Sequence, residues 1–181
     1  MCGIATIFNY GTFREAVDLS ELRNLTDVMF SRGSDGRAQW VHEKKHIGLG
    51  HRRLAIIDLS SASAQPMVSA DRNLHIVFNG EIYNYIELRK DLETKGYVFN
   101  SKGDTEVILY LYKEYGRSLV NYLRGMFAFV IWDDLKQGIL IARDHFGMKP
   151  LYYSSLGLKS YSQVLGGGAV EIFSKNMVLR K

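Results

Sequence analysis

Residues 1–9 read Met-Cys-Gly-Ile-Ala-Thr-Ile-Phe-Asn, a short apolar run that begins directly behind the only cysteine of the chain. The pattern of residues 3–9 predicts a buried strand. A residue as small as Cys2 permits removal of Met1, which would leave a thiol and a free α-amino group on the same residue. The fold and the chemistry of the chain therefore both start from this stretch.

Such a pairing is chemically useful. An α-amino group has an ordinary pKa of about 7.7–8.0 and a thiol one of about 8.5, so the amine can accept the proton that the thiol gives up. Nucleophile and base then belong to one residue. The alternative is a lone cysteine buried as a small hydrophobic residue. Cys2 alone favours this alternative, and the motifs further along the chain reverse the order.

Length and composition describe an ordinary globular protein. The 181 residues are 46% hydrophobic and 23% charged, with a net charge of +4, which predicts one domain or slightly more. Scattered basic residues give little support for a nucleic-acid partner. A single cysteine excludes a disulfide framework and a cysteine-rich zinc site. No apolar run approaches the roughly 18 residues of a membrane span, and the start is a poor signal peptide, so we expect a cytoplasmic protein.

Strand-like and helix-like segments occur in groups. Strand patterns cover residues 3–9, 39–42, 47–49, 53–57, 74–78, 126–132 and 139–142, the last two as a hairpin. Helix patterns include Leu19, Leu22, Leu25 and Val28 at threefold spacing, then residues 85–95, 105–115 and a short segment at 118–123. This order predicts an α+β fold with sheet-on-sheet packing. The three glycines at 166–168 indicate a flexible linker.

Two arginines at positions 52 and 53 adjoin an apolar segment. Arginine is seldom buried without a partner and can bind a carboxylate through two parallel bonds. We expect one of the two to have a function and the other to lie at a solvated strand end.

Residues 78–84 read Phe-Asn-Gly-Glu-Ile-Tyr-Asn. Asn-Gly is a strong turn signal, and locally a turn is the favoured interpretation. The functional alternative is that the Asn79 amide and the Gly80 backbone N–H point together as an oxyanion hole, with Gly80 allowing a ligand to approach the backbone. Asp104, ahead of the third helical segment, can cap that helix, bind a substrate ammonium group, or do both. The clusters at 32–36 and 143–147 indicate ordered turns, and His145 a structural residue.

Seven motifs in this order resemble the class II glutamine amidotransferase domain, above all that of glutamine-dependent asparagine synthetases. They lie at residues 1–4, 50–58, 65–67, 78–84, 103–109, 124–129 and 142–153. The resemblance implies an N-terminal-nucleophile hydrolase fold, a four-layer αββα sandwich of two stacked antiparallel sheets. It covers residues 1–153. Residues 154–181 do not match the family pattern and are expected to form a divergent or truncated tail.

The resemblance also implies roles for particular residues. Cys2 would attack the side-chain amide of glutamine, and Asn79 and Gly80 would stabilise the oxyanion. Arg53 would hold the substrate carboxylate and Asp104 its ammonium group. The remaining pocket residues would be Leu54, Ala55, Ile56, Ile57 and Glu81.

The expected activity is hydrolysis of L-glutamine to glutamate and ammonia through a thioester, with no metal or organic cofactor in this chain. A synthetase domain that uses ATP and Mg²⁺ is expected to be missing, because no Ser-Gly-Gly-x-Asp-Ser loop occurs. Another chain could supply it, and a homodimer is possible. Two alternatives stay open. One is the glutaminase module of an amino-sugar or purine-pathway amidotransferase, and the other is a non-catalytic remnant.

Overall fold

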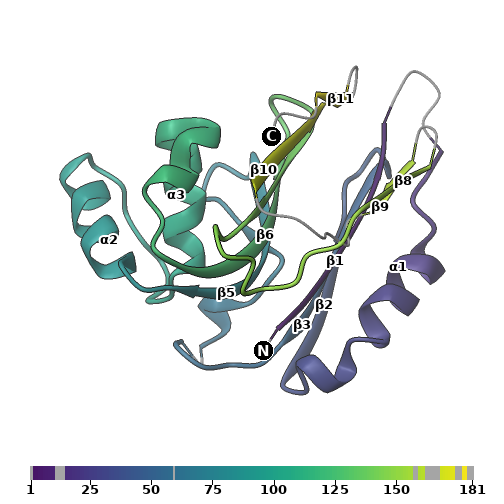
Figure 1. Ribbon diagram of the computed structural model, residues 1–181, viewed down its shortest axis with the longest axis horizontal. Coiled ribbons are helices and arrows are strands. Elements are labelled where there is room, and N and C mark those ends of the chain that lie inside the picture. Colours follow the sequence, from purple (N-terminus) through teal and green to yellow (C-terminus); the bar gives the residue numbers. More distant parts are fainter. Residues whose placement is uncertain are drawn as a thin grey trace.

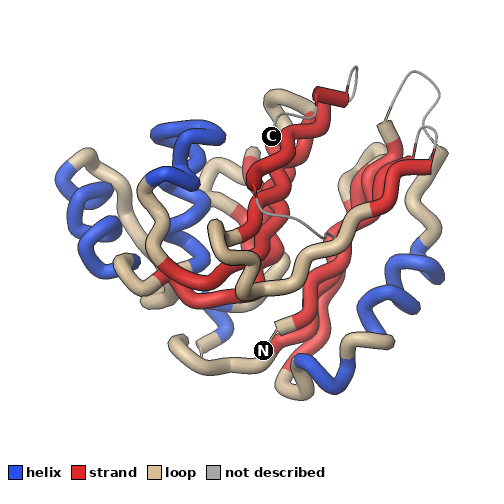
Figure 2. The backbone as a smooth tube through the Cα atoms, viewed as in Figure 1, coloured by secondary structure: helices blue, strands red, loops and turns tan. Residues whose placement is uncertain are grey.

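The computed structural model describes residues 2–10, 15–58, 60–156, 159–161, 168–173 and 177–178. They form two antiparallel sheets that lie face to face. Helix α1 (Leu19–Asp27) lies outside the first sheet, and helices α2 (Tyr85–Thr94) and α3 (Thr105–Tyr115) lie outside the second (Figure 1). The backbone trace shows the same layers, helix against sheet on both sides (Figure 2). The predicted α+β sandwich of two stacked antiparallel sheets is therefore confirmed.

The strand behind Cys2 is an inner strand of the first sheet. The order of this sheet is β2 (Gly36–Val41), β3 (Ile47–Arg53), β1 (Gly3–Asn9), β9 (Lys159–Tyr161) and β8 (Ser154–Leu156). All residues of β1 except one are buried. The prediction of a buried strand over residues 3–9 is confirmed, and both of its predicted ends are correct.

The second sheet has six strands. Their order is β11 (Met177–Val178), β10 (Gly168–Phe173), β7 (Gly138–Arg143), β6 (Gly125–Asp133), β5 (Leu74–Ile82) and β4 (Met67–Val68). The predicted hairpin is the β6–β7 pair. Three short 3₁₀ helices complete the elements, η1 (Phe30–Arg32), η2 (Ser61–Ser63) and η3 (Gly116–Asn121), of which η3 stands where a short fourth helix was predicted.

Apolar side chains fill the space between the layers. Phe8 and Leu49 of the first sheet pack with Val77, Val130 and Trp132 of the second, and all five are fully buried. Burying one such side chain contributes about 1.5–3 kcal/mol. A larger apolar cluster joins the outer face of the second sheet to α2 and α3. The two sheets are thus held at a fixed separation, which matters because the site described below draws residues from both.

The predicted apolar stripe of the first helix is only partly correct. Leu22 is fully buried against the first sheet and Leu25 packs beside it, but Leu19 and Val28 are 55% and 75% exposed. Three residues of an α-helix turn through about 300° rather than a full circle. A threefold repeat therefore drifts around the helix, and its two ends leave the buried face.

Helix α2 begins at the predicted residue, and no side chain caps its N-terminus. Asn84 precedes the helix but makes no capping bond. Its Nδ2 donates to the Tyr122 carbonyl and its Oδ1 accepts from the Arg124 N–H, both at 2.9 Å. The side chain therefore joins α2 to the segment before β6. Helix α3 has the predicted bounds and ends at Gly116, whose φ of +56° suits glycine.

Strands also occur in the segment predicted to be a divergent tail. β8 and β9 extend the first sheet, and β10 pairs with β7 along six residues of the second. Of the predicted glycine linker, residues 166 and 167 lie outside the described part, and Gly168 begins β10. The domain boundary at residue 153 stays a prediction. Among the described residues, no helix combines the length and the apolar character needed to cross a bilayer.

Candidate active site

All ten residues predicted for the site line a single pocket of about 130 Å³. The first sheet brings Cys2 to it at the start of β1 and Arg53 at the end of β3. The second sheet contributes three consecutive residues of β5, and Asp104 stands at the start of α3. The wall is completed by the segment after β3. The ten residues are Cys2, Arg53, Leu54, Ala55, Ile56, Ile57, Asn79, Gly80, Glu81 and Asp104.

The Cys2 thiol lies against the backbone of the segment after β3. The Leu54 N–H donates to Sγ at 3.4 Å, and the thiol donates to the Leu54 carbonyl at 3.6 Å. The Cys2 carbonyl accepts from Arg32 Nε at 3.3 Å. Cys2 is thus held in place by the segment after β3 and by η1. Removal of Met1 concerns a residue outside the described part and stays a prediction.

The strand predicted for residues 53–57 is wrong, because β3 ends at Arg53 and a loop follows. The Ala55 N–H donates to the Asp35 carboxylate at 2.9 Å, and the Asp35 N–H donates to the Arg53 carbonyl at 3.0 Å. The bond from Ala55 also lowers the pKa of Asp35. Ile56 and Ile57 are 59% and 42% exposed. A partner from the 32–35 loop replaces a neighbouring strand and turns this segment into a pocket wall.

Strand β5 directs one free edge toward the pocket. The Phe78 N–H donates to Gln65 Oε1 at 2.6 Å, and the Ile82 N–H donates to Asp104 Oδ2 at 3.0 Å. Both bonds point away from β6. Alternate residues of a strand present their N–H groups on the same side. Gly80 lies midway between Phe78 and Ile82, so its N–H points along this same edge, between two side chains that line the pocket.

The interpretation of Asn79-Gly80 as a turn is wrong, since both residues lie inside β5 and pair with β6. Phe127 lies opposite Gly80 on β6, but its backbone N–H and C=O form hydrogen bonds with Asp144 and not with Gly80. A Cβ at Gly80 would lie only 2.1 Å from the Met126 carbonyl oxygen. Glycine is therefore required here for the close approach of β6, rather than for the approach of a ligand as expected.

Asn79 faces the first sheet. Val77, two residues earlier on β5, belongs to the core between the sheets, and side chains two apart share a face. The Asn79 side chain is 3% exposed, and its Oδ1 has no hydrogen-bond partner within the described part of the chain. An oxyanion site requires donors, which here would be the Asn79 Nδ2 group and the neighbouring Gly80 N–H, whereas Oδ1 can only accept.

Arg52 and Arg53 have different partners, and both are half-buried, so the solvated strand end predicted for one of them is not seen. A function for one of the two stays a prediction. Arg52 binds Asp27 Oδ1 at 2.5 Å and the Thr26 carbonyl at 3.1 Å, so it joins β3 to α1. Arg53 enters the pocket wall, and its Nη2 donates to the carbonyls of Asp58 at 2.5 Å and Ser60 at 3.1 Å. Both hydrogens of Nη2 are thereby used. Nη1 and Nε are the donors left for a substrate carboxylate.

Asp104 is buried on the opposite side of the pocket. Asp104 occupies the N-cap position of α3, as predicted, but its side chain makes no capping hydrogen bond. Burial raises its pKa to about 6, against the effect of the bond from the Ile82 N–H, while the charge of Glu81 adds to the rise. A cation entering the pocket would restore the ionised form.

Several wall residues were not predicted. Burial lowers the pKa of His51 to about 4, and its ring binds the Phe78 backbone, so a neutral histidine joins the two sheets beside Asn79. Gln65 joins β5 to α3, and Lys149 is buried in the same wall. One indication of these residues is present in the sequence, namely that each lies within one of the seven motifs. Within the described residues, no group of three or more His, Cys, Asp or Glu is placed to hold a metal ion.

The clusters at 32–36 and 143–147 differ in their relation to the site. Arg32 and Asp35 support the pocket, which their sequence did not reveal. Asp144 accepts from the N–H groups of Phe146, Met148 and Lys149 and orders a turn, as predicted. His145 is exposed and does not line the pocket.

Comparisons with known proteins agree with this geometry. A family model described as "Glutamine amidotransferase domain" matches residues 1–169. Asparagine synthetase [glutamine-hydrolyzing] 1 of Bacillus subtilis (strain 168) is 44% identical over 162 residues, which are 89% of this chain and 25% of that protein. Amidase chry2 of Gibberella zeae is 38% identical over 164 residues, 85% of this chain and 24% of that protein. The chain therefore spans about a quarter of the length of these curated relatives.

A solved structure shows the same fold at low sequence identity. It is the glutamine phosphoribosylpyrophosphate amidotransferase from B. subtilis complexed with ADP and GMP, with a TM-score of 0.78 and 19% identity over 97% of this chain and 48% of that one. The likeness shows that this amidotransferase and the chain share the fold.

Proposed function

The chain belongs to the glutamine amidotransferase domain family, and from this premise we propose that its pocket hydrolyses the side-chain amide of L-glutamine to glutamate and ammonia. One observation carries the proposal. A thiol, a side-chain amide beside an outward N–H, a guanidinium group and a buried carboxyl group line one small pocket. The first two suit acyl transfer, and the last two match the charges of an amino acid. A non-catalytic remnant would have no reason to keep them together.

The reaction begins when the α-amino group of Cys2, freed of Met1, accepts the thiol proton. The thiolate attacks the amide carbon, and the resulting oxyanion accepts bonds from the Asn79 amide and the Gly80 N–H. The intermediate collapses, the C–N bond breaks, and ammonia leaves with the proton held by the amine. Water then adds to the thioester, with the amine again as base, and the C–S bond breaks to release glutamate.

The ends of the substrate are held by opposite charges. Arg53 binds the α-carboxylate through its remaining donors, and Asp104 in its ionised form binds the α-ammonium group. Glu81 and the backbone of residues 54–57 complete the wall. Glutamine fits this pocket because its amide then reaches Cys2 while its charged end stays between Arg53 and Asp104.

The ammonia acceptor is proposed from the relatives. Several asparagine synthetases are 35–44% identical to this chain, whereas the glutamine phosphoribosylpyrophosphate amidotransferase is a likeness of fold. We therefore favour a protein of the asparagine-synthetase type over the amino-sugar and purine alternatives, with ammonia passing to a synthetase domain on the same or another chain. That domain, rather than the glutaminase pocket, would use ATP and Mg²⁺.

Purified protein of these 181 residues is expected to convert glutamine to glutamate and ammonia, slowly. Aspartate and ATP should not change the rate, because the sequence contains no pyrophosphate loop of the synthetase kind. The experiment measures glutamate, ammonia, asparagine and pyrophosphate in one incubation. A protein that makes no glutamate would contradict the proposed activity. Asparagine or pyrophosphate would reveal a synthetase site that the sequence did not show.

The role of Asp104 predicts a pH dependence of glutamine binding. With a pKa of about 6, Asp104 is charged above pH 6 and neutral below it. The dissociation constant for glutamine should therefore rise as the pH falls from 7 to 5, because the neutral acid no longer attracts the ammonium group. Calorimetry on Cys2→Ala protein measures this binding without turnover.

Two variants in the same background sharpen the measurement. Asp104→Asn should weaken binding at pH 7 about tenfold or more and remove the pH dependence. Arg53→Ala should weaken binding at every pH and leave the dependence in place, because Asp104 is still present. In active protein both changes should raise KM more than they lower kcat. An Asp104→Asn protein with the pH dependence intact would show that another group titrates.

A further inference from the structure

The pocket wall between Arg53 and Asp104 is built by two segments that are distant in sequence. One follows β3 and includes η2, and the other precedes α3. The two segments lie close together, since a Cβ at Gly103 would lie 3.0 Å from the Ser63 Oγ atom and 3.8 Å from the Asp58 Cβ atom. We call the contact between these two segments the junction, and the pair Arg53 and Asp104 the substrate clamp. One residue of the clamp adjoins each of the two segments.

The Asp58 side chain is the centre of this junction. Its Oδ1 accepts from the Ser60 N–H at 2.9 Å. Its Oδ2 accepts from Ser63 Oγ at 2.7 Å and from the Lys102 N–H at 2.9 Å. Donors from Ser60, Lys102 and Ser63 hold the pKa of this carboxyl well below its usual range. Asp58 is thus ionised wherever the enzyme works, and it links the segment after β3 to the turn before α3.

The backbone of Asp58 faces the other end of the clamp. Its carbonyl and that of Ser60 accept both hydrogens of Arg53 Nη2. The Lys102 N–H, bound by the Asp58 side chain, lies two residues before Asp104. One residue therefore contacts the Arg53 guanidinium through its main chain and the Asp104 turn through its side chain.

We propose that Asp58 is a positioning residue for the substrate: it fixes the separation of the Arg53 guanidinium and the Asp104 carboxyl group by tying their two segments together. The inference rests on the proposed function, because it names the pair that binds glutamine. Asp58 acts through Arg53 and Asp104, because its main chain binds the Arg53 guanidinium group and its side chain binds the turn before Asp104. None of the three side-chain bonds of Asp58 involves Cys2 or β5, the elements of the reacting centre.

The test compares substitutions of Asp58 by their effect on KM and kcat. Asp58→Ala removes all three side-chain bonds and should raise KM for glutamine about tenfold or more, while kcat stays within about threefold. Asp58→Asn keeps one acceptor but presents a donor to a second N–H. Its KM should therefore lie between that of the parent protein and that of Asp58→Ala. Ser63→Ala removes a single bond and should raise KM about twofold to threefold.

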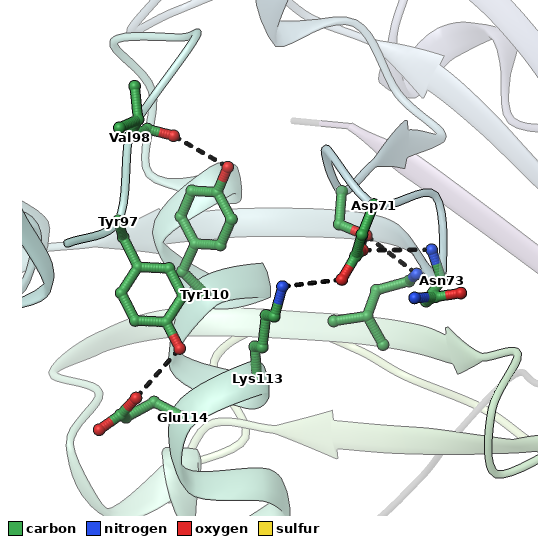
Figure 3. A network of polar contacts seen from close by, with 9 residues as sticks. Asp71, Asn73, Tyr97, Val98, Tyr110, Lys113 and Glu114 are labelled. Atoms are coloured by element: carbon green, nitrogen blue, oxygen red, sulfur yellow. Dashed lines mark hydrogen bonds and ion pairs between the residues drawn. The ribbon is translucent and has the colours of Figure 1, made fainter. Parts of the chain in front are cut away.

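Asp71 offers a matched control outside the pocket. It also accepts from a serine hydroxyl, Ser69 Oγ at 2.7 Å, and from a backbone N–H, that of Asn73 at 3.3 Å. It binds Lys113 Nζ at 2.7 Å as well (Figure 3). Asp71→Asn should lower the melting temperature without changing KM. Thermal unfolding of every variant shows whether a raised KM comes from loss of the fold or from misplacement of Arg53 and Asp104 in a folded protein.

A double variant distinguishes positioning from a general loss of structure. If Asp58 acts through Arg53, adding Asp58→Ala to Arg53→Ala should raise KM by much less than it does alone. An unchanged KM in Asp58→Ala, a fall in kcat alone, or fully multiplicative effects would overturn the inference. Should Asp58→Ala fail to fold, Asp58→Asn and Ser63→Ala give the same comparison.

Binding to the Cys2→Ala protein separates the two proposals. Glutamine that binds this protein but is not hydrolysed by the parent overturns the proposed activity alone, and the dissociation constants of the Asp58 series then replace KM. A failure of glutamine to bind overturns both. Hydrolysis by the parent together with an Asp58→Ala protein of unaltered KM overturns only the role of Asp58.

Discussion

Replacing Cys2 by alanine is expected to lower the rate of glutamine hydrolysis by at least about 10³-fold, because the thiolate forms the covalent intermediate and nothing else in the pocket can replace it. Alanine is as small as the position requires, so Met1 should still be removed and the protein should still fold. Cys2→Ser should also be severely impaired, since a hydroxyl group ionises far less readily than a thiol.

The measurement pairs a glutamate assay with the mass of the N-terminus. The parent and both variants should all lack Met1, so that they differ only in the nucleophile. Unreduced glutamine affinity in Cys2→Ala protein would show that the pocket is intact. Full activity in protein that retains Met1 would contradict the mechanism, because the α-amino group of Cys2 would then be part of a peptide bond.

The second large effect is expected at the oxyanion site. Asn79→Ala should lower kcat by about 10²–10³-fold with little change in KM, because its bond to the substrate oxygen strengthens only as the negative charge forms. Asn79→Asp should be worse, since it places a carboxylate where the oxyanion develops. Single-turnover kinetics would locate the loss in the acylation step.

Asn73 supplies a control of the same residue type. It lies in the turn before β5 and is not part of the pocket wall, so Asn73→Ala should leave both constants near the parent values. If Asn79→Ala changed KM alone, Asn79 would be a binding residue, and the assignment of the oxyanion site would be wrong.

Local sequence patterns predicted the parts of the fold that local forces decide. The bounds of β1 and α3 are correct, and so is the hairpin of β6 and β7, because each combines a clear apolar period with a glycine at one end. The stripe on α1 failed where a threefold repeat was extended over too many residues. The site residues were identified through motifs and charge, and all ten line the pocket.

Distant partners decided what the sequence did not reveal. The segment after Arg53 has the composition of a strand, but the Ala55 N–H binds the Asp35 carboxylate. Asn79-Gly80 has the composition of a turn, but β6 approaches so closely that glycine is needed within the strand. In both places a contact across the fold overrides local preference. Asp58 was quoted only as part of a motif, because nothing local shows which segments it joins.

The inner place of β1 in its sheet bears on how the protein is synthesised. Its neighbours are β3 and β9, and Ile7 pairs with Tyr161 at the far end of the chain. The strand behind Cys2 therefore has one edge open until the ribosome has made residues 159–161. During this interval an aminopeptidase can reach the N-terminus. We therefore expect the predicted removal of Met1 to take place before the first sheet is complete.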